Sequence, residues 1–397
     1  MADADTLTKT TTIERADRLK ALPPYLFVEI DKTKRRLQEQ GRDVIDLGVG
    51  DPDLPTPAPI ITKLQQTADD PANHRYNFTE GLRSLRHAIV AWYAQRFNVT
   101  LDPETEVLPL LGSKEGIANL PLALVNPGQT VLVPDPCYPP YRSGTIFAGA
   151  EVASMPLTEE QEFLPDFGGI SQRAARRAKL MFLNYPNNPT AAVATEACFQ
   201  EAIQLAHDYG FVVAHDAAYT EIAYDGFRPM SFLQIPEARE IGVEFHSLSK
   251  TYNMTGWRVG FVCGNARVIA ALRQFKTNVD SGIFQPVQWA AIEALQGDQA
   301  PVQQAVAIYQ QRRDLVVDRL TQAGWQIRKP QASFYIWARL PGQESSMAWV
   351  NRMLEQTQVV MTPGSGFGPA GEGYVRLSLT VPTERLQEAV DRIVKAL

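Results

Sequence analysis

A lysine flanked by hydroxyl side chains and an arginine is the segment of this 397-residue chain that is best suited to chemistry. Residues 245–260 read Phe-His-Ser-Leu-Ser-Lys-Thr-Tyr-Asn-Met-Thr-Gly-Trp-Arg-Val-Gly, so that Ser247 lies three residues before Lys250 and Arg258 eight after it. A neutral lysine amine attacks carbonyl carbons, and desolvation or a nearby cation lowers its pKa from about 10.4. Ser247 and Arg258 could then hold a phosphate on the same ligand. The plainer alternative is a solvated loop lysine, with Arg258 capping a helix or pairing with an acid.

Other polar side chains follow two apolar runs of the chain. Asn188 comes shortly after residues 179–183, and Asp216 directly follows residues 211–215, with Tyr219 one helical turn later. A carboxylate can hold a protonated pyridine nitrogen, while an amide and a phenol can hydrogen-bond a phenolate oxygen. Taken singly, Asp216 is better explained as a helix N-cap and Asn188 as a turn residue.

The elements that must position these groups are short apolar strands. Because near-continuous apolar strands are buried on both faces, we predict a sheet covered by helices, with a ligand crevice at the carboxyl ends of its strands. An amphipathic helix precedes the sheet, at residues 82–97. The predicted strands are residues 107–111, 130–133, 179–183, 211–214, 244–248 and 259–263.

The pattern of apolar residues changes from residue 286 onward. Longer helical patterns come first, and strand-like runs and a closing helix follow them. We therefore predict an α/β large domain and a second, smaller α+β domain. The helical patterns cover residues 287–295 and 300–323, and the strand-like runs cover residues 334–338, 359–362 and 374–379.

Composition excludes several classes of protein. The 38 Lys and Arg against 44 Asp and Glu leave a net charge of −6, which does not attract nucleic acid or anionic membranes. The first residues lack the pattern of a secretory signal, and no apolar run is long enough to span a bilayer. Three cysteines without zinc or redox spacing favour a cytoplasmic protein. We predict no metal site, and we expect His215 and His246, inside strand-like runs, to be hydrogen-bonded core residues.

Together, the motifs resemble those of the aspartate-aminotransferase group of pyridoxal-phosphate enzymes. Asn-Pro-Thr at 188–190, Asp216 with Tyr219, and Ser-Leu-Ser-Lys at 247–250 followed by Gly-Trp-Arg-Val-Gly at 256–260 match that group in order and spacing. The resemblance runs from residue 22 to residue 382, and segments 46–57, 110–116 and 244–258 look most like those of the LL-diaminopimelate aminotransferases.

The resemblance implies a fold and an assembly. The expected fold is α/β, namely fold type I of the PLP-dependent transferases. It has a large cofactor-binding domain at residues 47–285, built on a mostly parallel mixed sheet between helices. The small domain would combine residues 1–46 with residues 286–397. A homodimer with shared active sites is also implied.

The resemblance assigns the cofactor, pyridoxal 5'-phosphate, to particular residues. Lys250 would bond to it covalently and carry the proton that moves during catalysis. Asp216 would pair with its ring nitrogen, and Asn188 and Tyr219 would contact its ring hydroxyl. Tyr138 would stack on the ring. The phosphate would be held by Ser247, Arg258, the backbone amides of Ser113 and Lys114, and Tyr76 from the neighbouring subunit.

The implied reaction moves an amino group between an amino acid, LL-diaminopimelate first, and 2-oxoglutarate. Arg376 would fork onto the substrate α-carboxylate, with Asn188 and the backbone of Gly50 beside it. Candidates for reading the far end of the substrate are Tyr25, Glu80 and Asn278. The alternatives are a broader aspartate, alanine or aromatic aminotransferase, a lyase on the same cofactor, or a cofactor-binding regulator without catalysis.

One position departs from the family pattern. The family's Asn-Pro-Thr-Gly reads Asn-Pro-Thr-Ala at 188–191. If Ala191 needs a positive φ, the alanine costs about 1 kcal/mol or more. We expect a local adjustment that keeps the role of Asn188.

Overall fold

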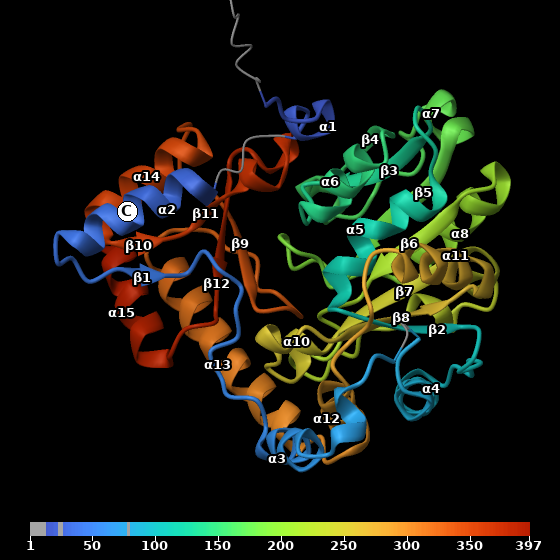
Figure 1. The fold of residues 1–397 in the computed structure, drawn as a ribbon. Coiled ribbons are helices and arrows are strands. Elements are labelled where there is room, and N and C mark those ends of the chain that lie inside the picture. The colour runs from blue at the N-terminus through green and yellow to red at the C-terminus, as the bar shows by residue number, and fades with distance from the viewer. Residues whose placement is uncertain (1–12, 23–26, 78–79) are drawn as a thin grey trace, which may run out of the picture.

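The structure is a computed structural model that describes residues 13–22, 27–77 and 80–397, and a seven-stranded sheet forms its largest element (Figure 1). The strand order is β2-β8-β7-β6-β5-β3-β4. β8 runs antiparallel to both of its neighbours, while the pairs formed by β3 to β7 are parallel, so the sheet is mixed but mostly parallel. The strands are β2 (Val107–Leu110), β3 (Thr130–Asp135), β4 (Glu151–Pro156), β5 (Ala178–Asn184), β6 (Val212–Asp216), β7 (Gly242–Ser247) and β8 (Gly260–Gly264).

Helices bury both faces of this sheet. One face packs in a core cluster that includes side chains of α5 (Ser113–Leu124), α6 (Pro140–Phe147) and α11 (Ala266–Thr277). The other face packs in a larger cluster with α4 (Arg83–Phe97) and α8 (Glu196–Tyr209). The α/β prediction and its six strands are thus confirmed. β4 was missed because it lies at the sheet edge with only Met155 buried, and its sequence contains no apolar run.

The smaller unit combines residues 30–46 with the C-terminal part of the chain. β1 (Ile45–Asp46) pairs in parallel with β10 (Val359–Val360), and Ile30 and Ile45 share a core cluster with Leu386. A three-stranded antiparallel sheet has the order β11-β12-β9. The elements are α2 (Phe27–Glu39), α13 (Ala300–Gln322), β9 (Tyr335–Arg339), α14 (Ser346–Thr357), β11 (Thr362–Pro363), β12 (Tyr374–Ser378) and α15 (Thr383–Val394).

The packing of one helix bears on where the large domain ends. The boundary expected between residues 285 and 286 falls at the start of α12 (Gln285–Gln296), yet Ala290 and Ala294 of this helix lie in the core of the larger unit. α12 packs on α3 (Ala58–Ala68) and α4. We therefore propose that the larger unit extends through α12, because its small apolar side chains are buried there.

Short helices complete the fold and connect the larger elements. They are α1 (Asp17–Lys20), α7 (Gln172–Arg177), α9 (Ala238–Ile241) and α10 (Leu248–Thr251). The part of the chain that the structure describes contains no helix long and apolar enough to cross a membrane.

Candidate active site

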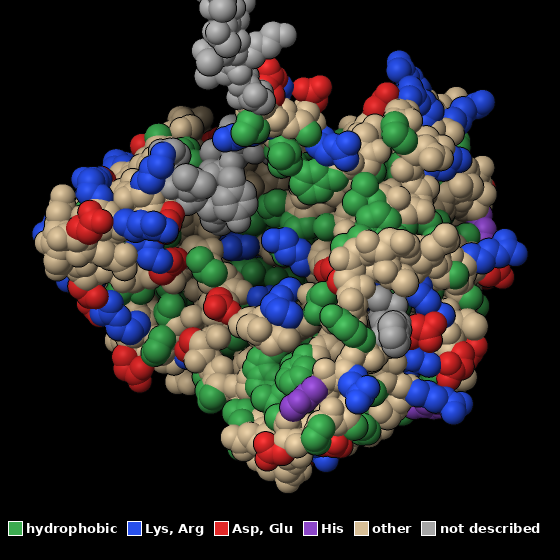
Figure 2. All heavy atoms as spheres, viewed as in Figure 1, with side chains coloured by type: hydrophobic (Ala, Val, Ile, Leu, Met, Phe, Trp, Pro, Cys, Tyr) green, Lys and Arg blue, Asp and Glu red, His purple; other side chains and the backbone are tan. Residues whose placement is uncertain are grey.

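A cavity of about 470 Å³ lies where the carboxyl ends of β5, β6 and β7 face the segment that follows β1. Figure 2 shows basic and hydrophobic side chains meeting in the hollow between the two units. The cavity brings together residues that are far apart in the sequence. Those predicted for the site are Gly50, Ser113, Lys114, Tyr138, Asn188, Asp216, Tyr219, Ser247, Lys250 and Arg258.

Lys250 lies in α10, which begins where β7 ends. Its Nζ donates a hydrogen bond of 2.7 Å to the carbonyl oxygen of Gly50 and lies 5.7 Å from the centre of the Phe334 ring. Burial lowers the pKa of Lys250, since an ammonium is costly to desolvate. Arg376 and Arg258 act in the same direction, and Tyr335 and Asp51 oppose it. The amine is therefore biased toward its neutral, nucleophilic form.

Asp216 ends β6 and offers one free acceptor. The hydroxyl of Tyr141 donates to its Oδ2 at 2.7 Å, whereas Oδ1 is buried and has no hydrogen-bond partner within the described residues. Burial raises the pKa of Asp216, and the bond from Tyr141 opposes this shift. A buried carboxylate oxygen without a partner in a cavity wall calls for a donor from a ligand, and a protonated ring nitrogen is such a donor.

Backbone and side-chain donors gather at the start of α5. The helix begins at Ser113 without a side-chain cap, after Gly112 with a φ of 79°. The positive φ favours glycine here, and a Cβ at Gly112 would lie 2.4 Å from Nη2 of Arg258 and displace the guanidinium. Arg258 donates to the carbonyls of Thr255 and Leu111 at 2.9 and 3.2 Å. Free amides at a helix N-terminus beside a guanidinium form a site for a phosphate.

Arg376, on β12, is a buried cation near this cavity. Its side chain is 5% exposed and has no carboxylate partner in the described part of the chain. Nη1 donates to Oδ1 of Asn188 at 2.8 Å, Nη2 donates to the carbonyl of Gly48 at 2.6 Å, and Nε has no partner among the described residues. These acceptors orient the guanidinium without cancelling its charge. The arrangement therefore suits an anionic ligand group.

The alanine at position 191 does occupy the left-handed region. Its φ is 57°, so the conformation that the family glycine would adopt freely is retained here. Asn188 keeps its contact with Arg376, and the amide of Ala191 donates to the carbonyl of Asn187 at 2.9 Å. The strain is thus borne locally by the backbone of Ala191.

We predict that Ala191→Gly raises the free energy of unfolding by about 1 kcal/mol, because glycine adopts a positive φ without strain. Urea unfolding of the two proteins measures the difference. The matched control is Ala192→Gly, at a buried neighbour without a positive φ, which should lower the free energy of unfolding by about 1 kcal/mol. Equal effects at both positions would contradict the strain argument.

Three predicted residues of the described part of the chain, Tyr76, Glu80 and Asn278, lie outside the cavity lining of one subunit. Tyr76 is 74% exposed and lies outside the cavity lining. Glu80 faces Arg273 at 3.4 Å, and Asn278 is exposed and donates to the carbonyl of Gln274 in α11, the helix that ends just before it. Tyr25 lies outside the described residues. The roles suggested for these four stay predictions.

The structure also adds residues that the sequence reasoning missed. Asn184 donates to the backbone carbonyl of Asp216 at 2.7 Å and accepts from the amide of Asn188 at 2.8 Å. It directly follows the predicted strand 179–183, as Asp216 follows the run 211–215, so the same rule could have found it. Ser249 lies inside the segment 245–260 already singled out, whereas Tyr141 lies three residues after the predicted Tyr138. Tyr335 comes from β9 and carried no local signal.

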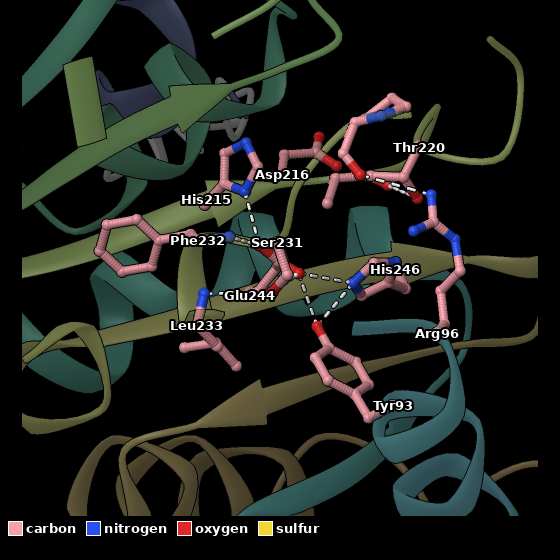
Figure 3. Close-up of polar contacts among 12 residues, drawn as sticks. Tyr93, Arg96, His215, Asp216, Thr220, Ser231, Phe232, Leu233, Glu244 and His246 are labelled. Atoms are coloured by element: carbon pink, nitrogen blue, oxygen red, sulfur yellow. Dashed lines mark hydrogen bonds and ion pairs between the residues drawn. The ribbon is translucent and has the colours of Figure 1, made fainter. Parts of the chain in front are cut away.

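The two strand histidines belong to a buried polar cluster, not to the cavity (Figure 3). Nδ1 of His215 and Nε2 of His246 lie 2.8 and 2.9 Å from the carboxylate of Glu244, which also accepts from Tyr93 at 2.6 Å. The amide of Tyr185 donates to Nε2 of His215, so the proton of that ring is on Nδ1, toward Glu244. The prediction of hydrogen-bonded core histidines is confirmed.

The chain belongs to the class I and II aminotransferase family, whose model matches residues 42–393. This family and its fold are PLP-dependent, and the observed mixed sheet with flanking helices is the predicted fold type I.

Particular relatives cover almost the whole chain. The LL-diaminopimelate aminotransferase of Syntrophobacter fumaroxidans is 53% identical over 381 residues, which are 96% of this chain and 98% of the relative. The substrate-bound BacF structure from Bacillus subtilis is 40% identical, with a TM-score of 0.93 over 97% of this chain and 98% of that one. An aspartate aminotransferase of Thermus thermophilus, a single mutant, is 28% identical with a TM-score of 0.90, covering 97% and 100%.

Proposed function

We propose that this protein is a pyridoxal-phosphate-dependent LL-diaminopimelate aminotransferase, which passes the amino group of LL-diaminopimelate to 2-oxoglutarate. The observation that carries the proposal is the convergence of a nucleophilic amine, an unpartnered carboxylate oxygen and an anion cradle on one cavity, with Arg376 behind it. The narrower substrate assignment is supported by the relative that is 53% identical over nearly its full length.

The residues present fit the cofactor. Asp216 would hold the ring nitrogen, Tyr219 and Asn188 would contact the ring hydroxyl, and Tyr138 would cover the ring. The amides of Ser113 and Lys114, with Ser247, Ser249 and Arg258, would hold the phosphate. When bound, pyridoxal phosphate supplies an aldehyde carbon for the substrate amine and a ring that withdraws electrons from the substrate Cα.

In this proposal, Lys250 is the residue that transfers the proton. With a substrate amine in its place, Nζ would be free, and burial, which lowers the pKa of Lys250, favours its neutral form. It would take the proton from the substrate Cα and return a proton to the carbon on the far side of the substrate nitrogen, the carbon that pyridoxal phosphate would supply. The hydrogen bond of 2.7 Å from Nζ to the carbonyl oxygen of Gly50 fixes the position of the amine.

Arg376 orients the substrate through its α-carboxylate. Asn188 holds one end of the guanidinium, so that the fork meets the carboxylate in a fixed plane. Both the amino donor and the 2-oxo acid carry this carboxylate, and the same arginine therefore serves both halves of the reaction.

We expect Arg376→Lys to raise the KM for amino donor and 2-oxo acid alike by about 100-fold, because an ammonium cannot bind the carboxylate and Asn188 with the same fork. Steady-state kinetics with both substrates measure this. A matched control is 1,5-diaminopentane, an amine without a carboxylate, whose slow turnover should be the same in both proteins. An unchanged KM for either physiological type of substrate would contradict the role.

We also propose a homodimer that completes the site. Three large apolar side chains are exposed: Tyr76 by 74%, Val279 by 58% and Phe284 by 52%. Gln285, next to Phe284, donates to the carbonyl of Arg75, next to Tyr76, so the segments that carry Phe284 and Tyr76 are neighbours. A second copy of the chain would cover them and receive Tyr76 at its phosphate site.

Cys137, Cys198 and Cys263 are free thiols, which supports a cytoplasmic enzyme.

A donor panel tests the proposed substrate. LL-diaminopimelate, aspartate, alanine and phenylalanine are each assayed with 2-oxoglutarate. We expect kcat/KM for LL-diaminopimelate to exceed the others by at least about tenfold. A preference for aspartate would replace the proposal with a broader aminotransferase. Release of ammonia without glutamate would identify a lyase, and the absence of turnover with every donor would identify a non-catalytic binder.

A further inference from the structure

Tyr335 is a buried residue that contacts three parts of the proposed site at once. It is the first residue of β9, in the smaller unit, and only 3% of it is exposed. Its neighbours are Tyr219 of the larger unit, Arg376 on the adjacent strand and Gly50 on the segment between the units. None of the functions described above is assigned to it.

The hydroxyl of Tyr335 lies 3.2 Å from the hydroxyl of Tyr219, and the two rings meet edge to face. Burial raises the pKa of Tyr219, and the neighbouring Tyr335 adds to this shift, so Tyr219 keeps its proton at neutral pH. When Tyr219 donates that proton into the cavity, the bond between the two hydroxyls can only be donated by Tyr335. A donor bonded to the oxygen of another donor strengthens the outer hydrogen bond.

The ring of Tyr335 supports the guanidinium of Arg376. Cζ of Arg376 lies 4.1 Å from the centre of the Tyr335 ring and 4.6 Å from that of Phe367, so the guanidinium is held between two aromatic rings. The strand register explains the contact. Ser378 is the direct partner of Tyr335, and Arg376, two residues away on β12, is its diagonal neighbour on the same face. Two cation–π contacts hold the plane of the guanidinium.

The third contact of Tyr335 is with the backbone of Gly50, which accepts the hydrogen bond from Lys250. A Cβ at Gly50 would lie 2.0 Å from the hydroxyl oxygen of Tyr335, so the chain can pass here only because residue 50 is glycine. The carbonyl of this same glycine accepts the hydrogen bond from Lys250. One side chain of the smaller unit therefore bears on the proposed positions of the amine, the ring hydroxyl and the substrate carboxylate.

We propose that Tyr335 is a positioning residue with two separable parts: its hydroxyl strengthens the donor Tyr219 toward the cofactor, and its ring holds Arg376 for the substrate carboxylate. The proposal rests on the function proposed above. It predicts that loss of the hydroxyl changes the state of the bound cofactor, while loss of the ring also changes substrate binding.

The test compares Tyr335→Phe and Tyr335→Leu with the wild type, each loaded with pyridoxal phosphate and titrated with pH while visible absorption is recorded. Tyr219 stabilises the negative ring oxygen, most of all when the nitrogen contributed by Lys250 is unprotonated. A weaker donor favours the protonated form, so Tyr335→Phe should raise the midpoint of the titration by about half a pH unit. The KM of Tyr335→Phe for substrate should stay within about twofold of that of the wild type. Tyr335→Leu should raise the KM for substrate about tenfold, because the ring beside Arg376 is lost.

Tyr252→Phe is the matched control, because Tyr252 is also buried but its hydroxyl donates to Gln299, away from the cavity. It should leave the titration midpoint unchanged. A folded Tyr335→Phe protein with the wild-type midpoint, or a control that shifts it equally, would overturn the inference alone. A wild type that forms no absorbing species with pyridoxal phosphate would overturn the proposed function, and the inference with it. Tyr335→Phe decides the outcome even if Tyr335→Leu does not fold.

Discussion

Replacing Lys250 with alanine should lower turnover with every amino donor by at least about 10⁴-fold while leaving a folded protein that still binds pyridoxal phosphate. The expected loss is large because one amine serves as nucleophile toward the cofactor and as the group that moves the proton. Among the described residues that line the cavity, only Lys114 also carries an amine, and it makes no hydrogen bond to Gly50 that would place it where Lys250 lies.

Binding and catalysis are measured separately in this test. Cofactor retention after dialysis reports binding through the phosphate and the ring, and single-turnover absorbance reports the proton transfer. Lys329→Ala is the control for loss of a lysine, because Lys329 bonds Asp314 at 2.8 Å and lies outside the cavity. A Lys250→Ala protein whose turnover stays within about tenfold of the wild type would remove the basis of the mechanism.

The second large effect is expected for Asp216→Asn, which should slow exchange of the substrate Cα hydrogen with solvent deuterium by about 10³-fold. The amide has the shape of the carboxylate and can still accept from Tyr141, but it is neutral. It therefore cannot hold positive charge on a ring nitrogen in the way that the unpartnered Oδ1 of the carboxylate can. Nuclear magnetic resonance of the substrate in deuterium oxide measures the exchange without requiring a complete reaction.

Tyr141→Phe is the graded comparison for this experiment. It keeps the carboxylate and removes only the hydrogen bond of 2.7 Å to Oδ2, so exchange should slow by about tenfold at most. If Asp216→Asn exchanges the Cα hydrogen as fast as the wild type, the carboxylate is not the partner of the ring nitrogen.

Much of the fold was predictable because apolar runs report burial on both faces of a strand. Six strands of the large sheet carry that signal, whereas β4 does not, since an edge strand needs no continuous apolar sequence. The position of α12 was harder to predict. Its helical pattern is plain, but the pattern does not say which of two cores its small side chains enter.

The site was predictable where its residues lie in short motifs or at strand ends. Lys250, Arg258, Asp216 and Asn188 are of this kind, and they do come together around one cavity or its Arg376 neighbour. Tyr335 could not be found this way. Its contact with Tyr219 spans 116 residues and depends on the pairing of β9 with β12 and on how the two units meet.

The residues proposed for the far end of the substrate show the same limit. Glu80 and Asn278 lie outside the cavity of one subunit, so any contact with substrate depends on an assembly that local sequence does not describe. Ala191 is the opposite case. Its strain followed from one residue type at one motif position, and its φ of 57° bears out that reasoning.

The most direct test of the proposed function is to follow the absorption of the pyridoxal-phosphate-loaded protein through the two half-reactions. Adding LL-diaminopimelate alone should remove the visible band as the amino group passes to the cofactor, and adding 2-oxoglutarate afterwards should restore the band and release one glutamate per site. A band that LL-diaminopimelate leaves unchanged, in a protein that responds to aspartate, would contradict the proposed substrate. A band that no amino donor changes would contradict the aminotransferase mechanism itself.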